Sequence, residues 1–147
     1  MLLAIPLGLA LFLFISLILA RVFGTEGAER TAITLLIKDE AAGNQAGMVS
    51  RIQDCAHSSA CRARMAHDAS TLKRAGSVSV LQLLPSTGFS LTSTVGTARV
   101  AWKTPGSLPV VQCVRVRRAG DAVSGITIEL LKLSARINSG ANCPRSF

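Results

Sequence analysis

Aromatic residues are scarce in this chain, and tyrosine is absent altogether. The 147 residues include one tryptophan and five phenylalanines, and no basic segment has aromatic side chains interleaved with its cations. Proteins that bind single-stranded nucleic acid usually combine cations with such stacking platforms, so this absence argues against a nucleic-acid partner. The chain also lacks a glycine-rich phosphate loop, a dinucleotide fingerprint and a calcium loop. We therefore expect no cofactor.

Charge is missing from the start of the chain, where residues 2–20 read LLAIPLGLALFLFISLILA. As a helix this run is about 28 Å long, close to the roughly 30 Å of a bilayer's hydrocarbon core. The run therefore predicts a transmembrane anchor over residues 1–23. A cut after Gly24 would make it a cleaved signal sequence, but the run is longer than most signal peptides have and no Lys or Arg precedes it. We favour an uncleaved, single-pass anchor in the cell membrane.

Two signals disagree about the side of the membrane on which the rest of the chain lies. Arg21, Arg30 and Lys38 follow the anchor, and by the positive-inside rule they favour a cytoplasmic domain. Four cysteines in about 120 residues are instead typical of an oxidising compartment. We give the cysteines more weight and expect an extracytoplasmic domain.

Cysteine and histidine gather in the segment RIQDCAHSSACRARMAHD, residues 51–68. Four potential zinc ligands are present (Cys55, His57, Cys61 and His67), but their spacing lacks the paired knuckle of known zinc motifs. A Cys/His nucleophile would need hydrogen-bond contact and a third group to orient the histidine. Free thiols are a further possibility. In an exported domain the simplest expectation is a disulfide between Cys55 and Cys61, because Ser58 and Ser59 allow the chain to turn between them.

The other two cysteines lie far apart in the sequence. Cys113 falls in a predicted strand, and Cys143 falls in the tail SGANCPRSF. A disulfide between them would hold the C-terminus against the sheet. Four cysteines allow three connectivities, and the sequence does not choose among them. A local pair with a strand-to-tail pair demands least of the fold, so we predict that connectivity.

After a small polar linker at residues 24–30, in which Thr25 caps a helix, apolar residues recur at helical spacing. Glycines at 43 and 47 are expected to interrupt the pattern, which gives two or three helices. Their apolar faces hold Ile33, Leu36 and Ile37, then Met48, Ile52 and Cys55, then Met65, Ala69 and Leu72.

From Ser77 the apolar period changes to two, and about four strands rich in Val, Ile and Thr follow. Turns at residues 104–109 and 119–125 are short, so neighbouring strands should be antiparallel. The sequence therefore predicts an α+β domain over residues 31–137, with the helices packed on a curved antiparallel sheet, and a C-terminal tail over 138–147.

This order of elements behind a membrane anchor resembles NTF2-like (cystatin-related) domains and is similar to the Mce-associated membrane proteins of actinobacteria, over residues 28–137. The resemblance implies a cone-shaped cavity between helix and sheet that serves ligand binding, catalysis or partner docking. Pilin-like subunits also begin with an apolar helix, but this chain has neither a basic leader with a processing site nor an early glutamate in its apolar run.

Acidic residues that could supply such a cavity with chemistry are few. The strand region contains only Asp121, in a turn, and Glu129. Strict alternation places Glu129 on the same strand face as Thr127, Leu131 and Leu133, where an edge salt bridge with a strand arginine is the favoured interpretation. Both histidines lie in the helical part. A non-enzymatic role is the better prediction.

Positive charge is concentrated between Met48 and Arg118, with ten Lys or Arg against two Asp. Alternation places Arg115 and Arg117 on one side of their strand, and Arg99 and Lys103 on one side of the strand before it. We expect these four to form an exposed basic face that contacts an anionic lipid or an acidic envelope protein. The predicted function is that of a membrane-anchored accessory or scaffold protein of a cell-envelope assembly. The alternative is a ligand carrier or small enzyme that uses the cone.

Overall fold

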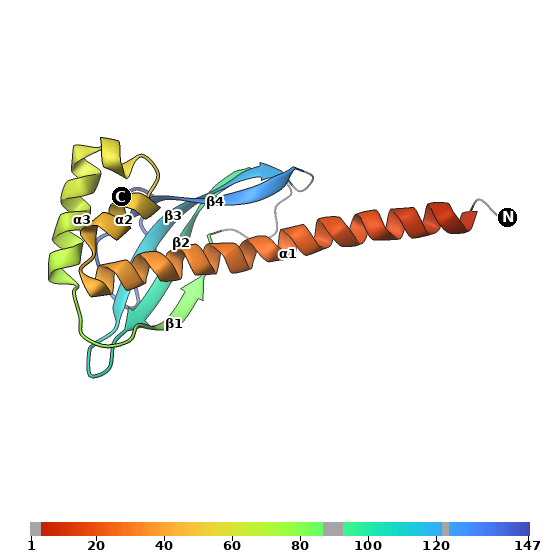
Figure 1. The fold of residues 1–147 in the computed structure, drawn as a ribbon. Helices are drawn as coiled ribbons and strands as arrows, with labels where there is room; N and C mark the ends of the chain where they lie inside the picture. The colour runs from red at the N-terminus through yellow and green to blue at the C-terminus, as the bar shows by residue number, and fades with distance from the viewer. Residues whose placement is uncertain (1–3, 87–92, 122–123) are drawn as a thin grey trace.

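The computed structural model describes residues 4–86, 93–121 and 124–147. It begins with one long helix, α1 (Ala4–Ala42), which at 1.5 Å per residue is about 58 Å long. The first half of α1 projects away from the molecule, and the second half lies against the domain (Figure 1). Leu7, Phe12 and Leu17 on the projecting half are each more than half exposed. The helix is therefore long and apolar enough to cross a membrane, a test that signal sequences also pass.

Helix α1 ends where the sequence predicts a break. Gly43 follows α1 with a φ of 73°, a conformation that glycine adopts at little cost. The side chain of Asn44 then accepts a hydrogen bond from Gly47 N and caps the next helix. The remaining elements of this part are α2 (Gln45–Arg51), the 3₁₀ turn η1 (Cys55–His57) and α3 (Ser59–Thr71).

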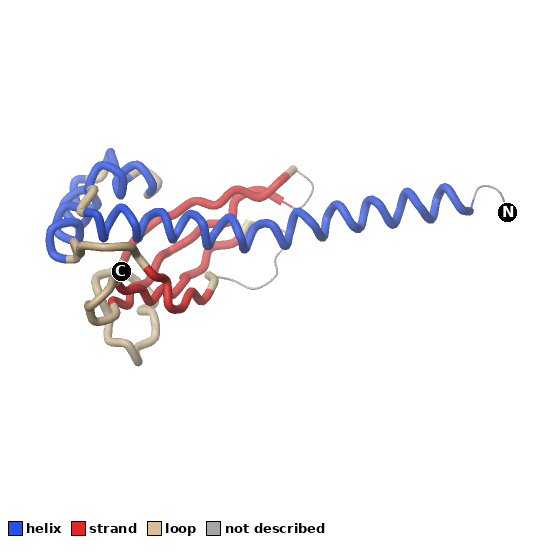
Figure 2. The backbone as a smooth tube through the Cα atoms, turned by 60° about the horizontal axis from the view of Figure 1, so that its bottom comes forward, coloured by secondary structure: helices blue, strands red, loops and turns tan. Residues whose placement is uncertain are grey.

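In the described part of the chain, four strands form one open antiparallel sheet, in which neighbours in space are also neighbours in sequence. Figure 2 shows α1 running past these strands and continuing beyond their ends. The predicted α+β class and the antiparallel sheet of about four strands are confirmed. The two or three helices expected after the apolar N-terminal helix correspond to the second half of α1, which continues that helix, and to α2 and α3. The tip of the predicted turn at 119–125 lies outside the described residues. The strands are β1 (Ser79–Leu84), β2 (Thr94–Lys103), β3 (Val110–Asp121) and β4 (Gly125–Leu133).

The hydrophobic core lies between one face of the sheet and the helices. Trp102 on β2 and Val114 on β3 are completely buried, as are Ile33 and Leu36 on α1 and Met48 on α2. All belong to one contiguous apolar cluster. Where the NTF2-like resemblance implies a cone-shaped cavity, these side chains pack against one another.

The predicted linker at residues 24–30 lies inside α1 in the structure, without a break. Two glycines in a helix cost about 1 kcal/mol each relative to alanine, so packing has to offset them. Thr25 and Glu29 supply that packing, because both are buried against the domain. One continuous helix therefore joins the apolar N-terminal half of α1 to the core.

A bulge in β4 changes which residues face the core. Arg115 pairs with Lys132 and Val116 pairs with Leu130, so Leu131 is the extra residue. Leu130 and Leu133 are both buried in the core as a result. Strict alternation, which placed Glu129, Leu131 and Leu133 on one face, was wrong at this point.

Candidate functional site

The cysteines and histidines between residues 55 and 67 form a disulfide-closed turn. Cys55 and Cys61 are joined, with their Cα atoms 5.2 Å apart. Ser58 Oγ accepts a hydrogen bond from Cys61 N and caps α3 inside this turn. His57 and His67 are exposed, and no group of three potential metal ligands occurs in the described part of the chain. The pairing is the one that the short loop predicts.

The second disulfide joins Cys113 to Cys143, with their Cα atoms 5.8 Å apart. Cys113 points to the outer face of β3, away from the helices, and yet it is completely buried. The C-terminal tail provides the cover: Ile137 N donates to Val111 O at 2.8 Å, and Cys143 Sγ lies 3.9 Å from Ala98 O. The tail therefore crosses the outer face of β2 and β3.

The four predicted cations share this outer face with Cys113. Arg99 is paired in register with Cys113, and Arg115 with Thr97, so the alternate residues of both strands point to one side. Lys132, which the sequence analysis missed, lies opposite Arg115 on β4 and adds a fifth cation. We call these five residues the basic face: Arg99, Lys103, Arg115, Arg117 and Lys132.

The tail occupies two members of the basic face. Arg99 donates from Nε to Ala141 O at 3.3 Å and from Nη2 to Ser139 O. Arg115 donates from Nη1 to Arg145 O at 3.1 Å. Both arginines are consequently half-buried rather than fully exposed.

The remaining members of the basic face differ in exposure, because Arg117 is half-buried and the two lysines are exposed. Arg117 Nη1 lies 3.1 Å from Glu129 Oε2, the cross-strand ion pair that the sequence favours. Lys103 and Lys132 are exposed, and neither side chain makes a hydrogen bond or an ion pair within the described residues. Lys103 and the β2 partner of Arg117 are eight residues apart, or about 27 Å along an extended strand. The basic face is thus a long stripe.

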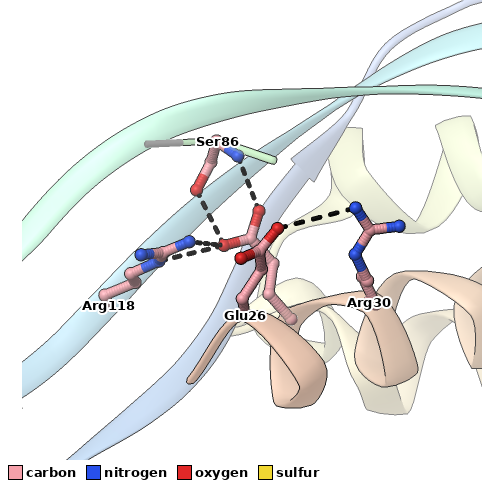
Figure 3. Close-up of polar contacts among 5 residues, drawn as sticks. Glu26, Arg30, Ser86 and Arg118 are labelled. Carbon is pink, nitrogen blue, oxygen red and sulfur yellow. Dashed lines mark hydrogen bonds and ion pairs between the residues drawn. The ribbon is translucent and has the colours of Figure 1, made fainter. Parts of the chain in front are cut away.

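A buried ion pair ties α1 to the sheet. Arg118 Nη2 lies 2.7 Å from Glu29 Oε2, and Glu29 also accepts hydrogen bonds from the backbone N–H and the hydroxyl of Ser86 at 2.7 and 3.0 Å. Figure 3 shows Ser86 and Arg118 turned toward the same carboxylate, while Arg30 reaches Glu26 on the exposed side. This contact joins α1, β3 and the end of β1 next to the exposed half of the helix.

A second buried carboxyl lies near the end of α1. Glu40 is completely buried, and its Oε1 accepts a 2.7 Å hydrogen bond from Gln112 Nε2. Gln112 Oε1 in turn accepts from Trp102 Nε1 at 3.0 Å. Burial raises the pKa of Glu40 to about 8, against the lowering effect of the Gln112 bond, and the charge of Asp68 raises it further. Glu40 lies about 29 Å along the helix from residue 21, so it belongs to the domain and not to the apolar half.

Asp68 on α3 is the neighbouring acid. Burial raises the pKa of its carboxyl, partly opposed by the charges of Arg64 and His67. Glu40 Oε2 and Asp68 Oδ2 are both buried, and neither has a hydrogen-bond partner among the residues that the structure describes. Two such carboxyls in one apolar region disfavour double ionisation, so a proton on Glu40 is the natural state at neutral pH.

The fold and this geometry define a class of protein: a small α+β domain carried rigidly on a long apolar helix, with its C-terminal tail fastened across a basic sheet face. Comparison with protein-family models, with curated proteins and with solved structures finds no match to this chain.

Proposed function

We propose that this chain is a membrane-anchored accessory or scaffold protein of a cell-envelope assembly, with its domain outside the cytoplasm. The observation that carries the proposal is the unbroken course of α1 from its exposed apolar half into the hydrophobic core. A domain on a flexible linker can turn freely, whereas a domain built around the second half of its own anchor is held at a fixed orientation. Such rigid presentation suits a scaffold.

The two disulfides support the outward orientation. All four cysteines are paired, and structural disulfides persist mainly in oxidising compartments. The cations that follow the anchor, Arg21, Arg30 and Lys38, still argue for the opposite side. Arg30 is partly offset by its ion pair with Glu26 at 3.5 Å, although acidic residues count for little in that rule.

The basic face is the surface that we propose for the partner. It carries five cations against one acid, Glu129, and two of the cations are exposed. The sheet lies beside the second half of α1, away from its exposed half (Figure 2), so lipid headgroups would reach little of a stripe about 27 Å long. An acidic protein therefore fits the surface better than an anionic lipid.

Charge reversal on exposed lysines tests this assignment. Full-length protein carrying Lys103→Glu and Lys132→Glu should recover fewer envelope proteins after detergent extraction than the wild type, and the wild-type association should weaken as salt rises. Lys38→Glu with Lys73→Glu is the matched control, because these lysines are exposed in the helical part and the charge change is identical. Equal recovery for both variants would contradict a role for the basic face.

A second candidate is a subunit of a helical filament, as in pilin-like proteins. The continuity of α1 favours it, since an apolar rod that projects from a fixed domain can be covered by the rods of other copies as well as by lipid. Chemical cross-linking in intact membranes separates the two proposals. A ladder of higher oligomers would favour the filament subunit, and monomers cross-linked to other envelope proteins would favour the scaffold.

The ligand-carrier alternative draws less support from the packing. It needs space between α1 and the sheet, and the residues that line this region are fully buried against one another. A cavity of about 620 Å³ lies elsewhere, beside the turn at Leu108 and the tail at Ile137. Glu129 points to the outer face and pairs with Arg117, as the favoured interpretation of the sequence expects.

A further inference from the structure

The outer face of the sheet already holds one polypeptide segment, its own tail. Three backbone carbonyls of the tail, those of Ser139, Ala141 and Arg145, accept hydrogen bonds from Arg99 and Arg115. Guanidinium groups bind carboxylates more strongly than neutral carbonyls, often through two parallel hydrogen bonds. Arg99 and Arg115 therefore bind neutral carbonyls where they could bind carboxylates more strongly.

We propose that the part of the basic face under the tail is a docking surface for an acidic polypeptide, and that the tail occupies this surface in the isolated chain. The inference rests on the proposed function and deepens it by naming the partner's chemistry. A polypeptide segment is indicated because the tail binds there through backbone carbonyls, with a turn at Ser139 and Gly140 and no helix or strand over residues 138–147. An acidic segment is indicated by the excess of cations on this face.

The Cys113–Cys143 disulfide holds the tail against the outer face of the sheet, and we call this disulfide the latch. Cys143 lies between Ala141, which contacts Arg99, and Arg145, which contacts Arg115, so one covalent bond holds both contacts in place. Asn138, Ser139 and Gly140 are exposed, and the half-buried Phe147 lines a pocket together with Met65 and Leu133. Without the latch, the contacts of Phe147 and the hydrogen bonds of the tail compete with a partner that offers carboxylates.

The test measures binding of a labelled poly-glutamate peptide to the full-length protein in detergent. The variant Cys113→Ala/Cys143→Ala opens the latch and should bind the peptide about tenfold more tightly than the wild type, because two arginines become available to pair with glutamates. Adding Arg99→Gln and Arg115→Gln to that variant should abolish the gain. Cys55→Ala/Cys61→Ala is the matched control, because it removes a disulfide without freeing the tail, and it should leave the affinity unchanged.

Trp102 fluorescence and a shorter tail separate a change in affinity from unfolding of the variant. The single tryptophan, Trp102, is completely buried, so its fluorescence reports whether each variant retains its core. If the latch-open variant unfolds, deletion of residues 144–147 with the disulfide intact frees Arg115 alone and should still raise the affinity severalfold. Unchanged affinity in a folded variant whose tail has become protease-sensitive would overturn the proposal.

Vesicles separate the possible sources of negative charge. If the latch-open variant gains affinity for phosphatidylglycerol vesicles and not for the peptide, the surface binds lipid and the acidic-polypeptide inference is wrong. These outcomes are distinct from failure of the proposed scaffold function, which is tested on the exposed lysines and leaves the tail in place.

Discussion

Glu29 on α1 and Arg118 on β3 are 89 residues apart in the sequence, and their side chains meet at 2.7 Å with only 0% and 5% of their surfaces exposed. This contact fixes the rotation of α1 relative to the sheet at the point where the helix leaves the domain. An ion pair buried in this way contributes less to net stability than to selecting one arrangement, because desolvation offsets much of the attraction. Here the arrangement that it selects is the direction in which the apolar half of α1 leaves the domain.

Removal of one partner of the Glu29–Arg118 ion pair should destabilise the fold. Glu29→Gln removes the carboxylate that pairs with the buried Arg118 guanidinium at 2.7 Å, and we expect the free energy of unfolding to fall by about 3 to 5 kcal/mol. Chemical denaturation of the full-length protein in detergent, followed by Trp102 fluorescence, measures the change. Glu26→Gln is the control, because its ion pair with Arg30 is half exposed on both sides and should be worth less than about 1 kcal/mol. Equal losses in the two variants would contradict the assigned burial.

Glu40 should make the domain less stable as the pH rises. Its pKa is about 8 in the folded protein and 4.5 ordinarily, so between these values the folded state keeps a proton that the unfolded state releases. The free energy of unfolding should therefore fall by up to about 1.4 kcal/mol per pH unit across this window and level off above pH 8. Asp68 contributes in the same direction, because its pKa is also raised.

Glu40→Gln tests this account directly. The variant can still accept the hydrogen bond from Gln112 but cannot ionise, so its stability should depend less on pH and exceed that of the wild type at pH 8. Glu26→Gln should retain the wild-type slope, since that carboxyl is exposed. A Glu40→Gln variant as pH-dependent as the wild type would assign the effect to other groups.

The elements of the fold were predictable because their apolar periods are local properties of the sequence. Ile33, Leu36 and Ile37 mark the buried side of α1, and the change of period after Ser77 marks the sheet. The connectivity of the disulfides was accessible for a related reason: a short loop favours Cys55 with Cys61, which leaves Cys113 for Cys143.

The continuity of α1 could not be predicted because the buried stripe includes polar residues. Thr25, Glu29 and Glu40 fall in helical register with Ile33 and Leu36, but a carboxyl normally marks the solvent side. Their partners, Arg118 and Gln112, come from β3 and approach only when the whole sheet is formed. The helical spacing of residues 25, 29, 33 and 36 was the feature of the sequence that indicated one continuous buried stripe.

The position of the tail over the basic face could not be predicted from the sequence, for a different reason. Arg99 and Arg115 bind backbone carbonyls of the tail, and a backbone acceptor leaves no pattern of side chains in the sequence. Lys132 was missed because the bulge at Leu131 shifts the alternation by one residue. Both features depend on the assembled sheet.

The two disulfides should contribute different amounts to the free energy of unfolding. The chain-entropy model predicts a loss of about 2 kcal/mol when Cys55→Ala/Cys61→Ala opens a separation of 6 residues. The loss should be about 3.5 kcal/mol when Cys113→Ala/Cys143→Ala opens a separation of 30 residues. Denaturation of the two double variants gives the comparison, and mass mapping of a non-reduced digest checks the pairings first. A larger loss for the shorter loop would show that native-state packing, and not chain entropy, dominates.

The orientation of the domain can be decided by protease accessibility. If the domain lies outside the cytoplasm, protease added to spheroplasts should remove it, starting in the exposed tail around Arg136 and Arg145, and leave the apolar half of α1 in the membrane. The result follows from the disulfides, which predict an oxidising compartment, and it runs against the cations that flank the anchor. A cytoplasmic marker protein must stay intact in the same sample, and permeabilised cells supply the fully digested reference. Protection of the domain until permeabilisation would place it in the cytoplasm, where the two disulfides would need another explanation.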